Sequence, residues 1–156
     1  MQTIYMLCGL PGTGKSTWAG KKSDKSTLIV NRDSIRTMIH GKYVFDVNYE
    51  RMIDDITKAS AYNILKNGYD LIIDETCTRR FIRDSWLHLI FKATGYSSKN
   101  ICVWFNAKTD INRIDSRGQS TKIWGEVVER MTSCFEPPSM DEGFSKIVKI
   151  DITKGD

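Results

Sequence analysis

The chain has 156 residues, of which 40% are hydrophobic and 27% are charged, and its formal net charge is +4. This length predicts a single domain with a hydrophobic core, and the composition excludes disordered, collagen-like and coiled-coil proteins. No apolar run approaches the roughly 18 residues of a membrane span, and the first residues lack the features of a signal peptide. We therefore expect a cytoplasmic protein with no membrane partner.

Short apolar runs alternate with helical patterns along the whole chain. The apolar runs predict buried strands over residues 4–8, 27–30, 71–73, 101–105 and 147–150. Periodicity and stop signals predict helices over residues 15–22, 34–39, 47–67, 81–93, 110–116 and 123–134. Such alternation is typical of an α/β domain with a mainly parallel sheet, which binds its ligands beyond the carboxyl ends of the strands.

A complete phosphate-binding motif follows the first predicted strand. Residues 9–16 read GLPGTGKS and match G-x-x-x-x-G-K-[ST]. In this motif successive backbone N–H groups surround a polyphosphate, the lysine reaches the β- and γ-phosphates, and the hydroxyl ligates Mg²⁺. The nucleotide-binding residues predicted here are Gly9, Gly12, Thr13, Gly14, Lys15, Ser16 and Thr17, with Ser16 as metal ligand.

The remaining motifs narrow the class of nucleotide-binding protein. A GTPase would carry N-K-x-D after the fourth strand, but the segment from Asn106 to Asp110 has one residue too many. Asp74 and Glu75 end a strand as in a motor ATPase, yet the chain is too short for a motor. A small kinase is left, and we expect residues 1–156 to form one P-loop kinase domain.

Two pairs of residues offer the chemistry that a kinase needs. Asp33 and Arg36 are three positions apart and share a helix face, so a proton acceptor and a phosphate-binding group can point into one pocket. Spacing alone leaves open that Asp33 is only a helix N-cap and that Arg36 is a surface side chain. Arg113 and Arg117 lie at i and i+4 before a flexible stretch, which suits a lid over the phosphates or simply a solvated helix face.

Taken in order, these motifs resemble the kinase domain of polynucleotide 5′-hydroxyl kinases of the phage and mammalian type. The resemblance runs from about residue 3 to residue 151 and rests on residues 9–16, 31–36, 74–76, 113–118, 135–138 and 142–144. It implies a five-stranded parallel sheet of the adenylate-kinase group, order 2-3-1-4-5, with an arginine-bearing lid. It also implies Mg²⁺-dependent transfer of the ATP γ-phosphoryl group to the 5′-hydroxyl of a DNA or RNA end.

The resemblance also assigns roles to individual residues. Asp33 matches the general base, and Arg36 matches the arginine that binds the 3′-phosphate next to the reacting nucleoside. Lys15 and Arg117 complete the expected catalytic set, with Arg117 and Arg113 on the donor phosphates. Cys77 stands where the family usually has Asn. We expect a separate ligase or phosphatase partner in nucleic acid repair, because no such domain accompanies the kinase.

Two other functions remain open at this point. A small-molecule kinase would use the same scaffold on a nucleoside or another metabolite, and a nucleotide-binding regulator would transfer little phosphate. Asp33 speaks against a regulator, while Arg36 and the arginine-rich segment 79–83 favour a phosphodiester acceptor. Four aromatic residues near these segments either stack on acceptor bases or belong to the core: Tyr43, Phe45, Tyr49 and Trp124.

Overall fold

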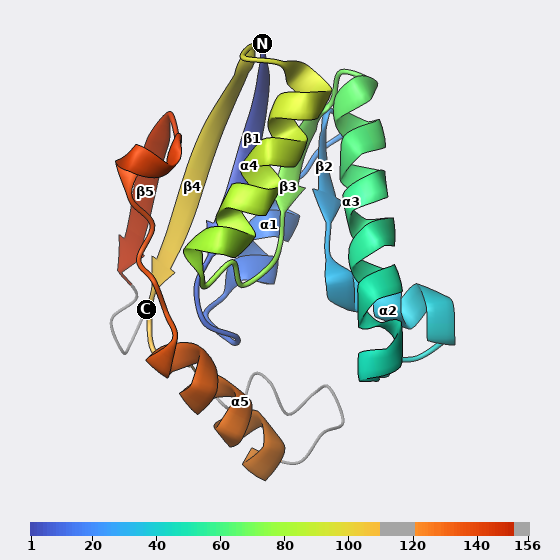
Figure 1. The fold of residues 1–156 in the computed structure, drawn as a ribbon, viewed down its shortest axis with the longest axis vertical. Helices are drawn as coiled ribbons and strands as arrows, with labels where there is room; N and C mark the ends of the chain where they lie inside the picture. Colours follow the sequence, from blue (N-terminus) through green and yellow to red (C-terminus); the bar gives the residue numbers. More distant parts are fainter. Residues whose placement is uncertain (110–120, 152–156) are drawn as a thin grey trace.

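The computed structural model describes residues 1–109 and 121–151, and its centre is a five-stranded parallel sheet (Figure 1). The strands are β1 (Gln2–Cys8), β2 (Thr27–Val30), β3 (Asp70–Ile73), β4 (Ser98–Asn106) and β5 (Lys146–Asp151). They pair in parallel in the order β2-β3-β1-β4-β5, which confirms the predicted fold class and strand order.

Helices cover both faces of this sheet, as connections between parallel strands require. The helices of the described residues are α1 (Lys15–Lys22), α2 (Arg32–His40), α3 (Glu50–Lys66), α4 (Arg80–Thr94) and α5 (Thr121–Ser133), with 3-10 turns at Val47–Tyr49 and Met140–Glu142, and α5 lies beyond the end of the sheet (Figure 1). Figure 1 shows α3 and α4 in front of the sheet and α1 behind it. Two apolar cores match these layers: Met6 packs with Leu65 and Trp86 of the front helices, and Leu7 packs with Ala19 of α1.

The start of α2 differs from the sequence-based expectation. The helix begins at Arg32, and its N-cap is Asn31, whose side-chain oxygen accepts a hydrogen bond of 2.9 Å from the Ser34 N–H. Asp33 lies inside the first turn, so the interpretation of Asp33 as the N-cap is wrong. Asn is as good a cap as Asp, and Asn31 has the extended backbone that a cap requires.

The other element boundaries lie close to the predicted ones. The helix expected over residues 47–67 is divided into the 3-10 turn at Val47–Tyr49 and α3. Strand β4 begins three residues before the predicted 101–105 run. The helix expected over residues 110–116 lies outside the described residues. Among the described residues, no helix is both long enough and apolar enough to cross a membrane.

A buried ion pair joins α4 to the 3-10 turn that precedes β5. Arg83 donates to both carboxylate oxygens of Glu142 at 2.8 Å, and Arg83 also donates to the Cys77 carbonyl at 2.9 Å. The side chains of the pair are 0% and 1% exposed. On the surface beside it, Arg80 pairs with Asp141 at 3.1 Å. Both arginines therefore serve the fold and give no support to the expectation that segment 79–83 contacts an acceptor.

The four cysteines of the chain differ in their burial. All four are free thiols, and Cys8, Cys77 and Cys102 are buried while Cys134 is exposed. Cys77, at the position where the family usually has Asn, is packed into the front core and has a left-handed backbone (φ 43°). Burial raises the pKa of the Cys77 thiol. This side chain therefore belongs to the core.

Candidate active site

The phosphate loop occupies the turn between β1 and α1, at the carboxyl edge of the sheet. The Gly9 N–H donates to the Thr76 carbonyl at 2.8 Å, which ties the loop to the segment after β3. A Cβ at Gly9 would lie 2.9 Å from the Phe105 carbonyl oxygen, so no larger residue fits there without a shift of backbone. Gly14 caps α1 with a left-handed backbone (φ 96°). Both glycines are therefore required by geometry.

Lys15 is folded over the loop that it follows. Its Nζ donates to the carbonyls of Gly9 at 3.0 Å and Leu10 at 2.6 Å, and the side chain is largely buried. Thr13 donates to the same Leu10 carbonyl at 2.8 Å. The positive charge is thus held within the loop, next to backbone N–H groups at the N-terminus of α1, which is where an anion binds most readily.

A hydroxyl and a carboxylate meet beside the loop. The Ser16 hydroxyl donates to Asp74 Oδ2 at 2.8 Å, and the Asn31 amide donates to the same oxygen at 2.9 Å and to the Asp74 carbonyl at 3.1 Å. Asp74 is buried at the end of β3. The strand end, α1 and the cap of α2 therefore converge on one carboxylate.

This pair of oxygen ligands fits Mg²⁺. Mg²⁺ is usually bound through one or two carboxylates together with waters and substrate phosphates. Within residues 1–109 and 121–151, no group of three or more His, Cys, Asp or Glu side chains could hold a metal ion alone. Ser16 and Asp74 therefore suit an ion that arrives with the nucleotide.

Asp33 and Arg36 point toward each other on α2. Arg36 Nη1 donates to Asp33 Oδ1 at 2.7 Å, and the predicted pairing of these residues on one helix face is present. Arg36 also donates to Glu50 of α3 through Nε at 2.9 Å and Nη2 at 2.6 Å. The guanidinium is buried, so the interpretation of Arg36 as a surface side chain is wrong.

Two carboxylates balance the charge of Arg36. Burial works to lower its pKa, but the hydrogen bonds and charge of Glu50, together with the charge of Asp33, outweigh burial and raise the pKa above its ordinary value. Sequence reasoning missed Glu50, because the contact spans 14 residues and depends on how α2 packs against α3. No local spacing rule connects the two positions.

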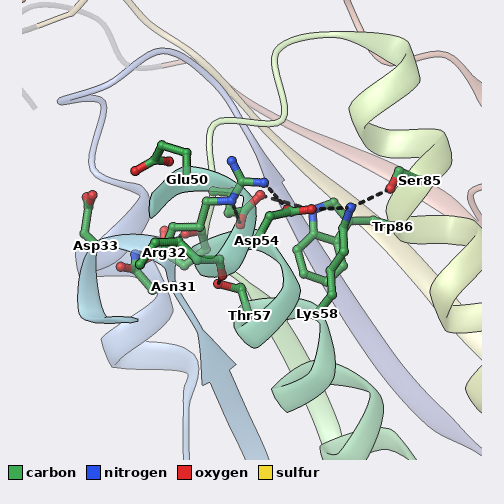
Figure 2. A network of polar contacts seen from close by, with 12 residues as sticks. Asn31, Arg32, Asp33, Glu50, Asp54, Thr57, Lys58, Ser85 and Trp86 are labelled. Atoms are coloured by element: carbon green, nitrogen blue, oxygen red, sulfur yellow. Dashed lines mark hydrogen bonds and ion pairs between the residues drawn. The ribbon is translucent and has the colours of Figure 1, made fainter. Parts of the chain in front are cut away.

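Arg32, next to Asp33, anchors α2 to its neighbours (Figure 2). It forms an ion pair with Asp54 of α3, and its Nε lies 3.1 Å from Glu75 Oε1, without the alignment of a hydrogen bond. The Trp86 indole N–H donates to the other Glu75 oxygen at 3.1 Å. Burial raises the pKa of Glu75, with Arg32 working in the opposite direction.

The same network continues from α3 to α4. Lys58 pairs with Asp54 at 3.0 Å and donates to the Ser85 hydroxyl at 2.9 Å, as the dashed lines in Figure 2 show. Burial works to raise the pKa of Asp54, but Lys58 and Arg32 outweigh it and lower the pKa. Polar contacts among α2, α3 and α4 therefore hold the helix that carries Asp33.

The structure describes the aromatic residues considered for base stacking but not the two arginines predicted to form a lid. Arg113 and Arg117 lie outside the described residues, so their roles stay predictions. Trp124 is buried, and the Tyr49 ring packs edge-on against His40 with centroids 4.9 Å apart. Phe45 is 54% exposed.

Comparisons with known proteins agree with this architecture. A family model described as an AAA domain matches residues 4–138. A chain in a structure of the Pnkp1/Rnl/Hen1 complex is 26% identical (TM-score 0.60), and the match covers 77% of this chain but only 40% of that one. A candidate kinase from Chloroflexus aurantiacus is 19% identical (TM-score 0.67), covering 96% and 85% of the two chains. A fungal RNA kinase is 12% identical (TM-score 0.63), covering 99% and 77%. The last two likenesses support the fold alone.

Proposed function

The chain belongs to the AAA domain family and has a P-loop kinase fold, and from this premise we propose that it is a polynucleotide 5′-hydroxyl kinase. It would transfer the γ-phosphoryl group of ATP to the 5′-hydroxyl of a DNA or RNA end. The observation that carries the proposal is the Asp33–Arg36 pair, 2.7 Å apart on α2, whose cap Asn31 hydrogen-bonds the Asp74 carboxylate beside the phosphate loop.

The residues divide the reaction between a donor side and an acceptor side. Lys15 and the loop N–H groups bind the donor phosphates, and Ser16 and Asp74 would hold Mg²⁺, which neutralises charge on those phosphates. Asp33 accepts the proton of the 5′-hydroxyl while the oxygen of that hydroxyl forms a bond to the γ-phosphorus. The bond from that phosphorus to the β–γ bridging oxygen breaks, and ADP leaves. By resemblance, Arg117 would act on the transferring phosphoryl group and Arg113 on the donor phosphates.

In this proposal Arg36 binds a phosphate as well as its two carboxylates. A guanidinium carries five N–H groups, and three of those on Arg36 donate to Glu50 and Asp33. Glu50 takes the Nε–Nη2 side of the group and Asp33 takes one N–H of Nη1, so the acceptor's 3′-phosphate would bind to the remaining N–H of Nη1 and of Nη2. The same guanidinium orients Asp33, so binding of the phosphate and placement of the base depend on one side chain.

A second candidate function is a small-molecule kinase. It is favoured by the charge balance at Arg36, because a guanidinium already paired with Glu50 and Asp33 suits a neutral acceptor better than an anionic one. Such an enzyme would use the same donor side and the same Asp33. The two functions differ in whether a phosphate on the acceptor improves the reaction.

The proposal is tested by transfer of labelled γ-phosphate from ATP to a 5′-hydroxyl oligonucleotide. Wild-type protein should label that oligonucleotide and leave its 5′-phosphorylated counterpart unlabelled. Asp33→Asn should lower the rate by about 10²–10⁴-fold while donor affinity is kept, because only the proton acceptor is removed. Unchanged turnover in Asp33→Asn would show that Asp33 is not the base.

We place this reaction in nucleic acid repair, because a 5′-phosphate is the group that a ligase consumes. The Pnkp1/Rnl/Hen1 structure is a complex of several proteins, and the present chain spans 40% of the length of the similar chain within it. A separate ligase or phosphatase partner would supply the steps before and after phosphorylation.

A further inference from the structure

Several large apolar side chains are exposed between the last turn of α2 and the first turn of α3. Five large hydrophobic residues in this short stretch are exposed: Met38, Phe45, Val47, Tyr49 and Met52. A contiguous exposed apolar patch marks an interaction site in many proteins, whereas a hydrophobic residue exposed singly needs no explanation, so the contacts of the individual residues decide. The stretch connects the helix that carries Asp33 to the helix that carries Glu50.

Phe45 is the member of this set that touches the candidate acceptor site. Its ring centroid lies 5.5 Å from the Arg36 guanidinium carbon, in a cation–π contact. Arg36 is buried, whereas Phe45 is 54% exposed and belongs to neither apolar core. The guanidinium thus covers one side of the ring, and much of the ring remains open to solvent.

We propose that Phe45 is a stacking platform for the base of the 5′-terminal nucleoside of the acceptor. This inference rests on the proposed function, in which Asp33 holds the 5′-hydroxyl and Arg36 holds the 3′-phosphate of that same nucleoside. The base of a nucleoside held at both ends of its sugar lies in the neighbourhood of these two side chains, and Phe45 is an exposed aromatic residue in contact with one of them. Every base has a π-face, so stacking on Phe45 tolerates any sequence at the 5′ end.

If Phe45 stacks on the terminal base, the effect of a substitution at Phe45 on acceptor KM should depend on whether that base is present. Loss of an aromatic stacking partner weakens binding of a single-stranded base by roughly 5- to 150-fold. Phe45→Ala should therefore raise the KM for a 5′-hydroxyl oligonucleotide by that factor and leave kcat nearly unchanged. An oligonucleotide that is abasic at its first position should be bound by wild type and Phe45→Ala alike, whereas one abasic at its second position should behave like the intact strand.

Two further variants separate stacking from coverage of Arg36. Phe45→Tyr keeps the π-face and should retain the KM of wild type, whereas Phe45→Leu keeps apolar cover and should resemble Phe45→Ala. Tyr96→Ala is the matched control, because Tyr96 is 94% exposed and lies just before β4, at the amino-terminal end of the strands and away from the phosphate loop. Tyr96→Ala should leave the KM for the intact strand and for the strand abasic at its first position unchanged. Thermal unfolding of each variant verifies that the fold is intact.

The outcomes distinguish this inference from the function on which it rests. If wild-type protein labels neither intact nor abasic acceptors, the proposed function is wrong and the platform falls with it. If wild type labels both and Phe45→Ala raises KM equally for both, or if Phe45→Leu restores the wild-type KM, Phe45 only covers Arg36. Either of these results overturns the stacking assignment while leaving the kinase intact.

Discussion

Glu142→Gln removes the charge that balances Arg83 inside the protein. Both side chains are essentially inaccessible to water, and two hydrogen bonds of 2.8 Å join them. Breaking a buried ion pair by removing one partner costs about 3–5 kcal/mol, because the remaining charge stays buried without its counter-ion. That is a large part of the roughly 5–15 kcal/mol by which a domain of this kind is stable. The midpoint of thermal unfolding should fall by about 6–20 °C.

Urea unfolding followed by circular dichroism measures this cost directly. The midpoint should fall while the dependence of the free energy of unfolding on urea stays the same, since the fold itself is retained. Asp141→Asn is a control one residue away, because Asp141 pairs with Arg80 on the surface, where the two side chains are 65% and 45% exposed. It should leave stability almost unchanged. Equal small effects of the two variants would refute the structural role assigned to Glu142.

Two other variants test the donor side and the buried network. Lys15→Ala should abolish phosphoryl transfer and leave the unfolding midpoint near that of wild type, because its ammonium acts on phosphate charge; turnover near the wild-type rate at saturating ATP and Mg²⁺ would contradict the assignment. Burial raises the pKa of Glu75 above its ordinary value of 4.5, so the folded protein binds this proton more tightly than the unfolded chain. The free energy of unfolding should therefore fall as pH rises from about 4.5 through the raised pKa, and Glu75→Gln should flatten that part of the pH profile. Urea unfolding at a series of pH values measures this profile. The same pH dependence in wild type and in Glu75→Gln would refute the assignment.

The parts that the sequence could predict are those encoded locally. The phosphate loop is a contiguous motif, so the positions of Gly9 and Lys15 in it could be predicted from residues 9–16 alone. The parallel sheet follows from short apolar runs separated by helices. The pairing of Asp33 with Arg36 follows from a three-residue spacing on one helix. Each of these inferences needs only neighbouring residues and the helical or strand period.

The parts that could not be predicted depend on tertiary packing. Glu50 reaches Arg36 only because α3 packs beside α2, and Glu142 reaches Arg83 across 59 residues. The error at the start of α2 has a local cause, since Asn31 and Asp33 are both suitable caps and only the backbone conformation chooses between them. The sequence of segment 79–83 favours acceptor binding only because sequence does not show that Arg83 is buried.

The central claim is that a phosphate on the acceptor, held by Arg36, positions the hydroxyl that reacts. The most direct measurement compares kcat/KM for a nucleoside 3′-phosphate and for the bare nucleoside, in wild type and in Arg36→Ala. We predict that wild type strongly prefers the 3′-phosphate, since that group supplies most of the positioning, and that Arg36→Ala loses the preference and uses both acceptors poorly. Equal use of the two acceptors by wild-type protein would contradict the account and favour a small-molecule kinase.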